Sequence, residues 1–486
     1  MNDLGKLINS LTDTEVDMLR NKYTNNNSNK NSLKLKLLNL IKDNNIMEDK
    51  ILSRHIYNVV VTPALKQLKY RLYDDIITIL AFVGGKATFK SNLFLAKNKV
   101  RKYVINSEIL LARGFDDLAI LLLKKALKNA KKYELTSDLL TIYDLLQRHE
   151  GQKKGLSTYK KYGILKGQEF RILESKSDAH AIFYEVMLHE MFQKNSRDTY
   201  IESLEIALEK LEQHSVLTNS FEIKALKLRA GTYYGHLSEK YNIALSNAKE
   251  YLKLTYDNQI VSSLSNQAGA HMQLGMIHLY LDSFPQSIEH ARLASELFPK
   301  NSINQLRAAE ITFVSCLLTG NIDKLLLIIN EVKVHPGYKS SNMIGEIWRL
   351  REIVSKFLQG RYEDSLKMLR THQNELETES GWAIGYRIIE IITVLELKLY
   401  DWFEPRLKSL KHIGKSRGTD FRLATIIRIL STLEKYNYNY NNLLNKDFEL
   451  IEQLENKFGK NKWDPFGYEV VPFHKWIRSK EKSAVN

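Results

Sequence analysis

The stretch MQLGMIHLYLDSFPQSIEHARLASELFPK, from Met272 to Lys300, holds two apolar patterns of helical spacing on either side of a break at Asp282-Ser283-Phe284. In the second pattern, small residues recur three or four positions apart, at Ser287, Ala291 and Ala294. Small side chains let two helices approach closely, whereas large ones hold the helix axes apart. The stretch therefore predicts a helical hairpin.

The same arrangement returns along the chain with a period near forty residues. The position equivalent to Ser287 is occupied by Ala119, Ser203, Ala244, Leu325, Ser365 and, as a poor match, Arg406. The spacings are 84, 41, 43, 38, 40 and 41 residues, and the first covers two periods with a degenerate unit near Tyr159–Leu165. Five residues before most of these positions stands a glycine or a polar residue, which predicts a turn. A fixed period of this length predicts stacked hairpins that bury their apolar faces against one another.

Composition and proline placement agree with an all-helical chain. Hydrophobic residues make up 44% and charged residues 26%, enough for a large core. Stretches that alternate with period two are few and short. Only 7 prolines occur, and four of them fall at predicted breaks between helices, at Pro285, Pro299, Pro336 and Pro405. We therefore expect an all-α fold.

The best unit resembles a tetratricopeptide repeat. The residues that match the preferred positions of such repeats are Leu274, Gly275, Phe284, Ala291, Ala294 and Pro299, with partial matches at Gly114, Ala119, Ala126, Gly360 and Tyr362. The resemblance covers roughly residues 88–440, with repeats longer than the usual length of about 34 residues. It implies a right-handed α-solenoid of helical hairpins whose concave face is the ligand surface.

Both ends of the chain depart from the repeats. The opening LGKLINSLTDTEVDML, with helical segments at Ser32–Asn44 and Ala64–Leu80, is similar to the leader of uncharacterised tetratricopeptide-like proteins from Bacteroidetes, as is the C-terminal FHKWIRSK. Thr12 and Glu15 form a capping-box pattern that predicts a helix start. We expect a helical cap domain at 1–87, a repeat array at 88–440, and a final helix with an extended aromatic tail at 441–486. The aromatic residues expected to hold the tail are Trp463, Phe466, Tyr468, Phe473 and Trp476.

Motifs for catalysis are absent from the sequence. Gly84-Gly85-Lys86 lacks the upstream glycine and the following Ser or Thr of a phosphate-binding loop. The lone Cys316 stands among apolar residues and is expected to be a buried thiol. Glu185 and His189, four positions apart, have no second ligand pair, and neither do His180 and Tyr184. We expect a protein that is not an enzyme and that holds no cofactor or metal.

The sequence also suggests a compartment. The N-terminus has no basic lead followed by an apolar stretch of signal-peptide length. The longest apolar run, from Ile76 to Gly85, is too short to span a bilayer. We expect a soluble cytoplasmic protein with no membrane partner.

Positive charge is concentrated in one part of the chain. Of the net charge of +15, residues Lys86–Lys166 carry 18 − 7 = +11, and the other 405 residues carry 53 − 49 = +4. We define the basic strip as the cations of this region expected on two or three adjacent helices: Lys97, Lys99, Arg101, Lys102, Lys124, Lys125, Lys128, Lys131, Lys132, Lys153 and Lys154. Lysine dominates over arginine, which favours diffuse attraction to an acidic partner over bidentate recognition. A solvated helical face is the alternative interpretation.

Three functions are compatible with these features. The first is a non-catalytic adaptor that binds a peptide or protein segment of acidic character in the concave groove. The second is a nucleic-acid or ribosome-associated factor that uses the basic strip. The third is a ligand-sensing transcriptional regulator with an N-terminal DNA-binding head, although residues 1–60 carry only 9 − 7 = +2. A homodimer is a further assembly that the sequence allows.

Overall fold

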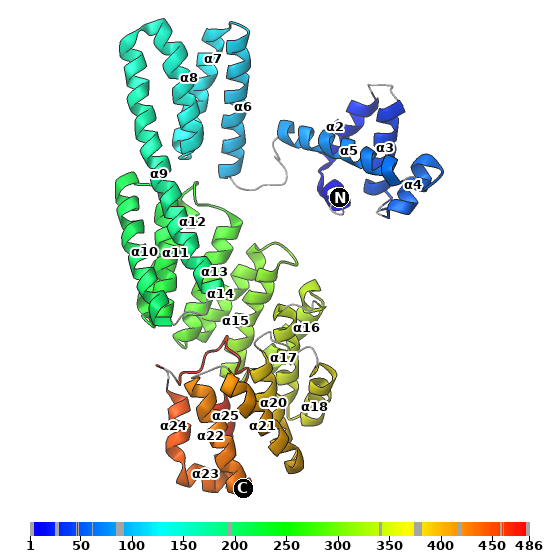
Figure 1. Ribbon diagram of the computed structural model, residues 1–486, viewed down its shortest axis with the longest axis vertical. Helices are drawn as coiled ribbons and strands as arrows, with labels where there is room; N and C mark the ends of the chain where they lie inside the picture. The colour runs from blue at the N-terminus through cyan, green and yellow to red at the C-terminus, as the bar shows by residue number, and fades with distance from the viewer. Residues whose placement is uncertain are drawn as a thin grey trace. The chain divides into compact units, whose positions relative to one another are not determined.

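All regular secondary structure in the described part of the chain is helical. The computed structural model describes residues 4–24, 29–44, 46, 48–60, 62–83, 92–192, 197–339, 343–373, 382–416, 420–456, 459 and 461–482. Within these ranges no helix is both long and apolar enough to cross a lipid bilayer. The all-α expectation is therefore confirmed (Figure 1).

The N-terminal helices form a small bundle with its own core. They are α1 (Leu4–Ser10), α2 (Asp13–Thr24), α3 (Asn29–Lys42), α4 (Asp49–Tyr57) and α5 (Thr62–Val83). The predicted capping box is present, because the Thr12 amide donates to Glu15 Oε2 at 2.9 Å and the Glu15 amide donates to Thr12 Oγ1 at 3.4 Å. Leu19, Leu38 and Leu72 are completely buried in this core. The predicted boundary at 87/88 lies outside the described residues.

The repeat region follows as consecutive helices. The first are α6 (Asn92–Ala112), α7 (Asp116–Lys132), α8 (Thr136–Lys154), α9 (Leu156–Phe192), α10 (Arg197–Thr218), α11 (Phe221–Leu237) and α12 (Tyr241–Asp257). They continue as α13 (Leu264–Tyr280), α14 (Phe284–Leu297), α15 (Ile303–Thr319), α16 (Ile322–Lys333), the 3₁₀ helix η1 (Pro336–Lys339), α17 (Met343–Leu358) and α18 (Tyr362–Thr371). The degenerate unit near Tyr159–Leu165 falls at the start of α9, which runs on for 37 residues.

The chain ends in shorter helices. They are α20 (Ala383–Glu396), the 3₁₀ helix η2 (Tyr400–Trp402), α21 (Phe403–Ser416), α22 (Phe421–Lys435), α23 (Tyr440–Lys446), α24 (Phe448–Glu455) and α25 (Phe473–Lys482). The predicted extended tail is wrong beyond residue 472, because α25 buries the apolar side chains of Phe473, Trp476 and Ile477 and is thereby stabilised by packing. Residues 461–472, which we call the C-terminal segment, are not helical.

The hairpin geometry follows from the predicted turn positions. At five of the seven positions of the forty-residue series, the residue five places earlier has a left-handed backbone; these residues are Gly114, Glu239, Asp282, Gly320 and Gly360. Small residues then bring the paired helices together. A Cβ on Gly275 of α13 would lie 3.2 Å from the carbonyl oxygen of Ser287 on α14. The period of hairpins is therefore confirmed by the backbone itself.

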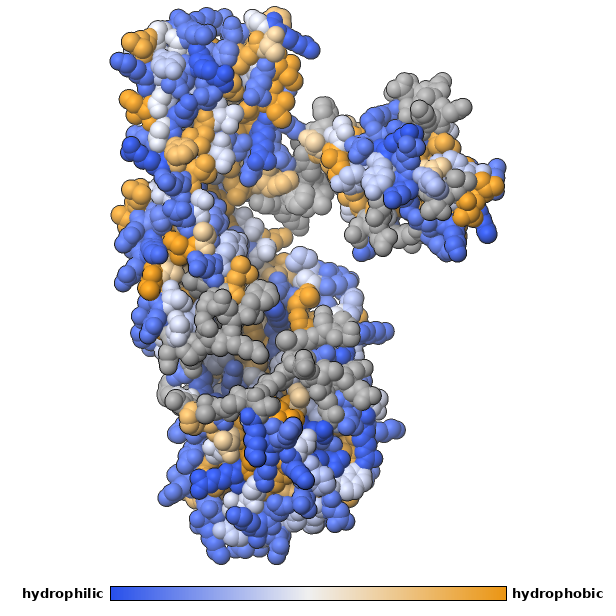
Figure 2. Space-filling model, viewed as in Figure 1, coloured by the Kyte–Doolittle hydropathy of each residue, from blue (hydrophilic) through white to orange (hydrophobic). Residues whose placement is uncertain are grey.

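Contacts divide the chain into two compact units. Unit 1 comprises Met1–Met191, Glu209–Lys227 and Leu254–Leu264, and unit 2 comprises Phe192–Leu208, Leu228–Lys253 and Ser265–Asn486. Unit 2 has a large continuous core that extends from α13 to α25, with Trp348, Tyr386 and Phe403 almost completely buried. On the face drawn in Figure 2, apolar side chains at the surface are interspersed with hydrophilic ones.

Candidate functional site

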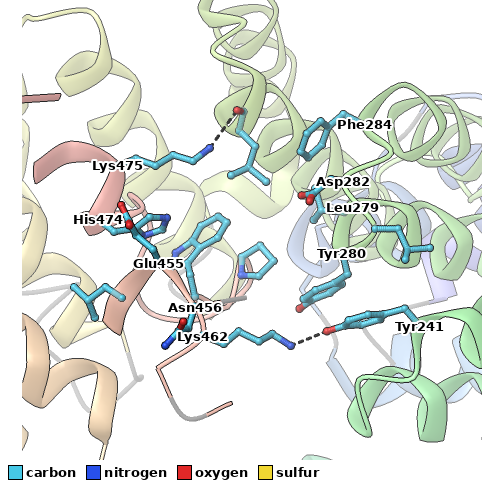
Figure 3. A pocket seen from close by; sticks show the side chains of 15 residues that line it. Tyr241, Leu279, Tyr280, Asp282, Phe284, Glu455, Asn456, Lys462, His474 and Lys475 are labelled. Atoms are coloured by element: carbon cyan, nitrogen blue, oxygen red, sulfur yellow. Dashed lines mark hydrogen bonds between the residues drawn. The ribbon is translucent and has the colours of Figure 1, made fainter. Parts of the chain in front are cut away.

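A hollow in unit 2 is the best-formed candidate site. Its volume is about 520 Å³, and Figure 3 shows the side chains around it. One wall comes from the ends of helices α12 to α15, and the other comes from the end of α24, the C-terminal segment and the start of α25. The lining residues are Tyr241, Leu279, Tyr280, Leu281, Asp282, Phe284, Leu318, Leu454, Glu455, Asn456, Lys462, Trp463, Pro465, His474 and Lys475.

The hairpin of α13 and α14 builds the first wall. The left-handed turn at Asp282 ends α13 directly after Tyr280 and starts α14 at Phe284. Both aromatic side chains therefore stand at the same end of the hairpin and line the hollow. Leu318, near the end of α15, extends the apolar surface. The repeat turn thus places apolar groups where another segment can lie against them.

A buried ion pair holds the opposite wall in place. Arg422 of α22 donates to both carboxylate oxygens of Glu469, with 2.8 Å between Nη2 and Oε1. Both side chains are at least 95% buried. Glu469 also accepts the Phe473 amide at 2.7 Å, and the indole of Trp463 donates to the Glu469 carbonyl at 2.9 Å. Burial raises the pKa of Glu469, whereas the guanidinium of Arg422 opposes this shift.

Close backbone packing against α20 also fixes the C-terminal segment. A Cβ on Gly385 of α20 would lie 2.2 Å from the carbonyl oxygen of Tyr468. Real Cβ contacts are never this short, so only glycine lets the C-terminal segment pass here. The segment is therefore held by both charge and shape.

Lys462, near the start of the C-terminal segment, lies against two tyrosines, Tyr241 and Tyr280. The rings of Tyr241 and Tyr280 are stacked, with centroids 5.3 Å apart and planes 11° from parallel. The Lys462 ammonium lies 5.3 and 5.2 Å from these two centroids. It also donates to Tyr241 Oη at 2.6 Å and lies 3.2 Å from Glu239 Oε1. We call Glu239, Tyr241 and Tyr280 the lysine cage.

The rim of the hollow combines charges of both signs. The Tyr280 hydroxyl donates to Asp464 Oδ1 at 3.0 Å, and the Lys475 ammonium reaches the Leu318 carbonyl at 3.4 Å. Burial, with the nearby Arg422 guanidinium, lowers the pKa of His474 to about 4, so this imidazole is neutral at pH 7. An apolar floor with a polar rim suits a short segment of polypeptide that supplies both kinds of group.

The sequence did not single out this hollow. Of its lining residues, Trp463 was expected to hold the tail and Phe284 was expected at a repeat position, but neither was expected at a binding site. The signal that was present is NKWDPFG, residues 461–467, in which charged, aromatic and turn-forming residues interrupt the helical pattern. Nothing in that pattern states that Lys462 lies against Tyr241, which is 221 residues away.

The basic strip lies on three helices of unit 1. Lys97, Lys99, Arg101 and Lys102 are on α6, five lysines from Lys124 to Lys132 are on α7, and Lys153 and Lys154 end α8. Glu150 accepts from Lys124 at 2.9 Å and from Lys154 at 2.5 Å. Burial alone would raise the pKa of Glu150, but the hydrogen bonds from Lys154, Lys124 and Tyr162 lower it to about 2. Part of the strip is thus neutralised within the protein.

Further members of the strip also have carboxylate partners. Asp117 pairs with Lys153, and Asp138 lies 3.4 Å from the Nε of Arg101. Lys97 lines a separate hollow of about 280 Å³ that includes Glu134, Asp138 and Glu222. The strip is therefore a mixed-charge surface in these places.

The other strip lysines are less engaged. Three of them lie over tyrosine rings, Lys99 over Tyr103, Lys131 over Tyr143 and Lys132 over Tyr133, at 5.9, 5.9 and 5.4 Å from the centroids. Lys125 and Lys128 are exposed, and neither has an ion pair with any residue that the structure describes. Binding of an acidic partner by the strip stays a prediction.

The remaining sequence candidates have ordinary structural surroundings. His180 Nε2 lies 2.8 Å from Glu222 Oε1, and its ring stacks on Tyr184. Cys316 is buried, as expected. The residues Gly84–Lys86 and the side chain of His189 lie outside the described residues. Among the side chains that are described, no group of three or more His, Cys, Asp or Glu is arranged to hold a metal ion.

Comparison with known proteins finds little similarity. No protein-family model matches the chain, and no curated protein matches it. One similar solved structure is a signal transduction ATPase with numerous domains and a tetratricopeptide repeat sensor, from Pyrococcus horikoshii. It is 15% identical with a TM-score of 0.31, and the match covers 82% of this chain and 55% of that one, so this chain spans about half the length of the ATPase. The similarity to Bacteroidetes proteins stays a prediction.

Proposed function

We propose that this chain is a non-catalytic helical-repeat adaptor that binds a peptide segment of a partner protein in the hollow of unit 2. One observation carries the proposal. The chain's own non-helical C-terminal segment already lies against the ends of α12 and α13, held there by side-chain contacts to Tyr241 and Tyr280, and space of about 520 Å³ remains beside it. A surface that binds the side chains of one polypeptide segment is suited to bind a second segment from a partner protein.

The size of the hollow sets the expected affinity. Burying one large apolar side chain contributes about 1.5–3 kcal/mol. A charge-assisted hydrogen bond at the rim contributes roughly 1.5–3 kcal/mol more. After the cost of ordering the peptide, a short peptide is expected to bind with a Kd in the micromolar to millimolar range.

Substituting Leu318 with glutamate tests this proposal. Selection of a random heptapeptide library on the full chain should yield peptides that the wild type binds. Leu318→Glu should weaken their binding at least tenfold, because a carboxylate then stands in the apolar wall. Fluorescence anisotropy with labelled peptides measures the affinity.

Leu327→Glu is the matched control. Leu327 lies on α16, the helix that follows α15, and its side chain is 62% exposed. The selected peptides should bind this variant as they bind the wild type. Equal loss in both variants, or full binding by Leu318→Glu, would contradict peptide binding in the hollow.

Nucleic-acid binding is a second candidate, favoured by Lys125 and Lys128. These two exposed lysines stand one turn apart on α7. If they bind phosphates, affinity for a single-stranded RNA should fall steeply between about 50 and 200 mM salt. Lys125→Glu with Lys128→Glu should then abolish binding, whereas Lys153→Glu, whose native partner is Asp117, should have a smaller effect. A filter-binding titration with an oligouridine 20-mer decides this, and unchanged binding by the double variant excludes this surface.

The regulator hypothesis rests on the N-terminal bundle. Helices α1 to α5 share a core of their own, which is a reason to test residues 1–83 alone for DNA binding. Retention of specific DNA by that fragment supports the hypothesis. No gel shift by a folded fragment removes it.

A further inference from the structure

The lysine cage is a formed cation site that the chain occupies with its own side chain. The Tyr241 hydroxyl, the Glu239 carboxylate and the Tyr280 ring surround one ammonium, which lies 5.2 Å from the Tyr280 centroid, inside the range of cation–π attraction of about 6 Å. The side chains of Lys462 and Glu239 are only 14% and 17% exposed. An ammonium in such a place is largely removed from water, so its contacts with the Glu239 carboxylate and the Tyr280 ring are stronger than at an open surface.

All three residues of this cage belong to the turns of the repeat hairpins, not to the C-terminal segment. Glu239 has a left-handed backbone and lies in the turn between α11 and α12, and Tyr241 is the first residue of α12. Tyr280 is the last residue of α13, and its hydroxyl binds Asp464. The turns that recur every forty residues therefore supply all three cage residues, and Lys462 only fills the site.

We propose that the lysine cage recognises a lysine of the partner peptide, and that Lys462 is a built-in competitor for it. This inference rests on the proposed function, since it names the chemistry of the segment that the hollow accepts. The order of groups on the partner is the one the chain shows: a lysine for the cage, then an aromatic residue for the apolar wall, then an acidic residue for Tyr280. The partner has to displace the front of the C-terminal segment before its own lysine enters.

Lys462 is a strong competitor for the cage because it belongs to the same chain. A tethered group acts at an effective concentration on the order of millimolar, so a free peptide with the same groups competes poorly. Removing the Lys462 ammonium empties the cage and leaves the other lining residues of the hollow in place. Affinity for a lysine-bearing peptide should then rise about tenfold or more.

The test uses the full chain and two probe peptides. One is fluorescein-labelled NKWDPFG, the sequence of residues 461–467. The other carries norleucine in place of the lysine, which keeps the aliphatic stem and removes the charge. Lys462→Met and Lys462→Ala should each bind the lysine peptide at least tenfold more tightly than the wild type does, by fluorescence anisotropy. The norleucine peptide should show no such gain.

Two further variants separate the cage from general effects. Lys446→Ala removes a lysine that also lies near a tyrosine ring, that of Tyr436, but is exposed, and it should leave the affinity unchanged. Adding Tyr280→Leu to Lys462→Met should remove the gain. A circular-dichroism melt shows whether each variant keeps its helices. Lys462→Met retains an apolar side chain of similar length, so the test can still be made with this variant if Lys462→Ala destabilises the C-terminal segment.

The outcomes distinguish this inference from the proposed function. If Lys462→Met binds the norleucine peptide as tightly as the lysine peptide, the hollow accepts peptides without reading a lysine, and the inference is wrong while the function stands. If neither peptide binds any variant at 1 mM (about the weakest measurable limit), the lysine inference is rejected. The peptides selected for the Leu318→Glu experiment then decide the function separately.

Discussion

Replacing Arg422 with alanine is expected to lower the free energy of unfolding of unit 2 by about 3–5 kcal/mol. The guanidinium is buried and donates to Glu469 and to the Leu454 carbonyl at 2.9 Å. Without it a carboxylate stays inside the protein with no counter-charge, which is the costly way to break such a pair. All five tryptophans lie between Trp348 and Trp476, so tryptophan fluorescence during urea unfolding reports unit 2 alone.

Two comparisons isolate the role of the buried pair. Arg428→Ala removes an exposed arginine from the same helix and should change the unfolding free energy by less than about 0.5 kcal/mol. Arg422→Met combined with Glu469→Leu should recover most of the loss, because no buried charge then remains. Equal urea midpoints for Arg422→Ala and Arg428→Ala would show that the pair does not hold the C-terminal segment.

Acid is expected to destabilise unit 2 through buried and half-buried histidines. Burial lowers the pKa values of His271, His278 and His290. The His290 ring contacts the other two rings, with 3.0 Å between the Nδ1 atoms of His271 and His290. His474 has a pKa of about 4, with burial as the largest cause and Arg422 as the next. The unfolded chain binds protons near pH 6.5, before the folded chain does. These groups therefore give full stability above pH 6.5, and it is lost progressively as the pH falls toward 4.

The expected size can be stated for His474. A difference of about 2.5 pH units between the unfolded and folded pKa corresponds to on the order of 3 kcal/mol at pH 4. The urea midpoint of the wild type should thus fall between pH 7.5 and pH 5, and His474→Gln should fall less steeply. His412→Gln, at an exposed position of α21, should retain the wild-type pH dependence. Identical pH profiles for the wild type and His474→Gln would contradict this assignment.

The hairpins could be predicted from the sequence because they are local. The turn at Asp282 and the small residue at Ser287 are five positions apart, and the same spacing from a left-handed turn recurs at five of the seven positions of the series. The hollow could not be predicted, because its walls come from distant parts of the chain. Asp464 binds Tyr280 across 184 positions, and no local pattern encodes that pairing.

The basic strip shows the opposite case, in which local charge was visible and its partners were not. The sequence places Lys124 and Lys154 in two successive charge-rich helices, but it does not show that Glu150, on the same helix as Lys154, accepts hydrogen bonds from both lysines. A list of the cations alone therefore overstates the free positive charge of the strip. On α7, Lys125 and Lys128 are exposed and have neither an ion pair nor a cation–π contact with a described residue.

The return of the C-terminal segment to α12 has a consequence for how unit 2 comes apart. A linear array of repeats loses its terminal hairpin first, because that hairpin has one neighbour only. Here Lys462 of the C-terminal segment binds Tyr241 at the start of α12, so a contact across 221 positions links the last helices to an earlier hairpin. Stretching the chain from its C-terminus should then meet a larger barrier than fraying of one hairpin, since the C-terminal segment has to detach from α12 and α13 first.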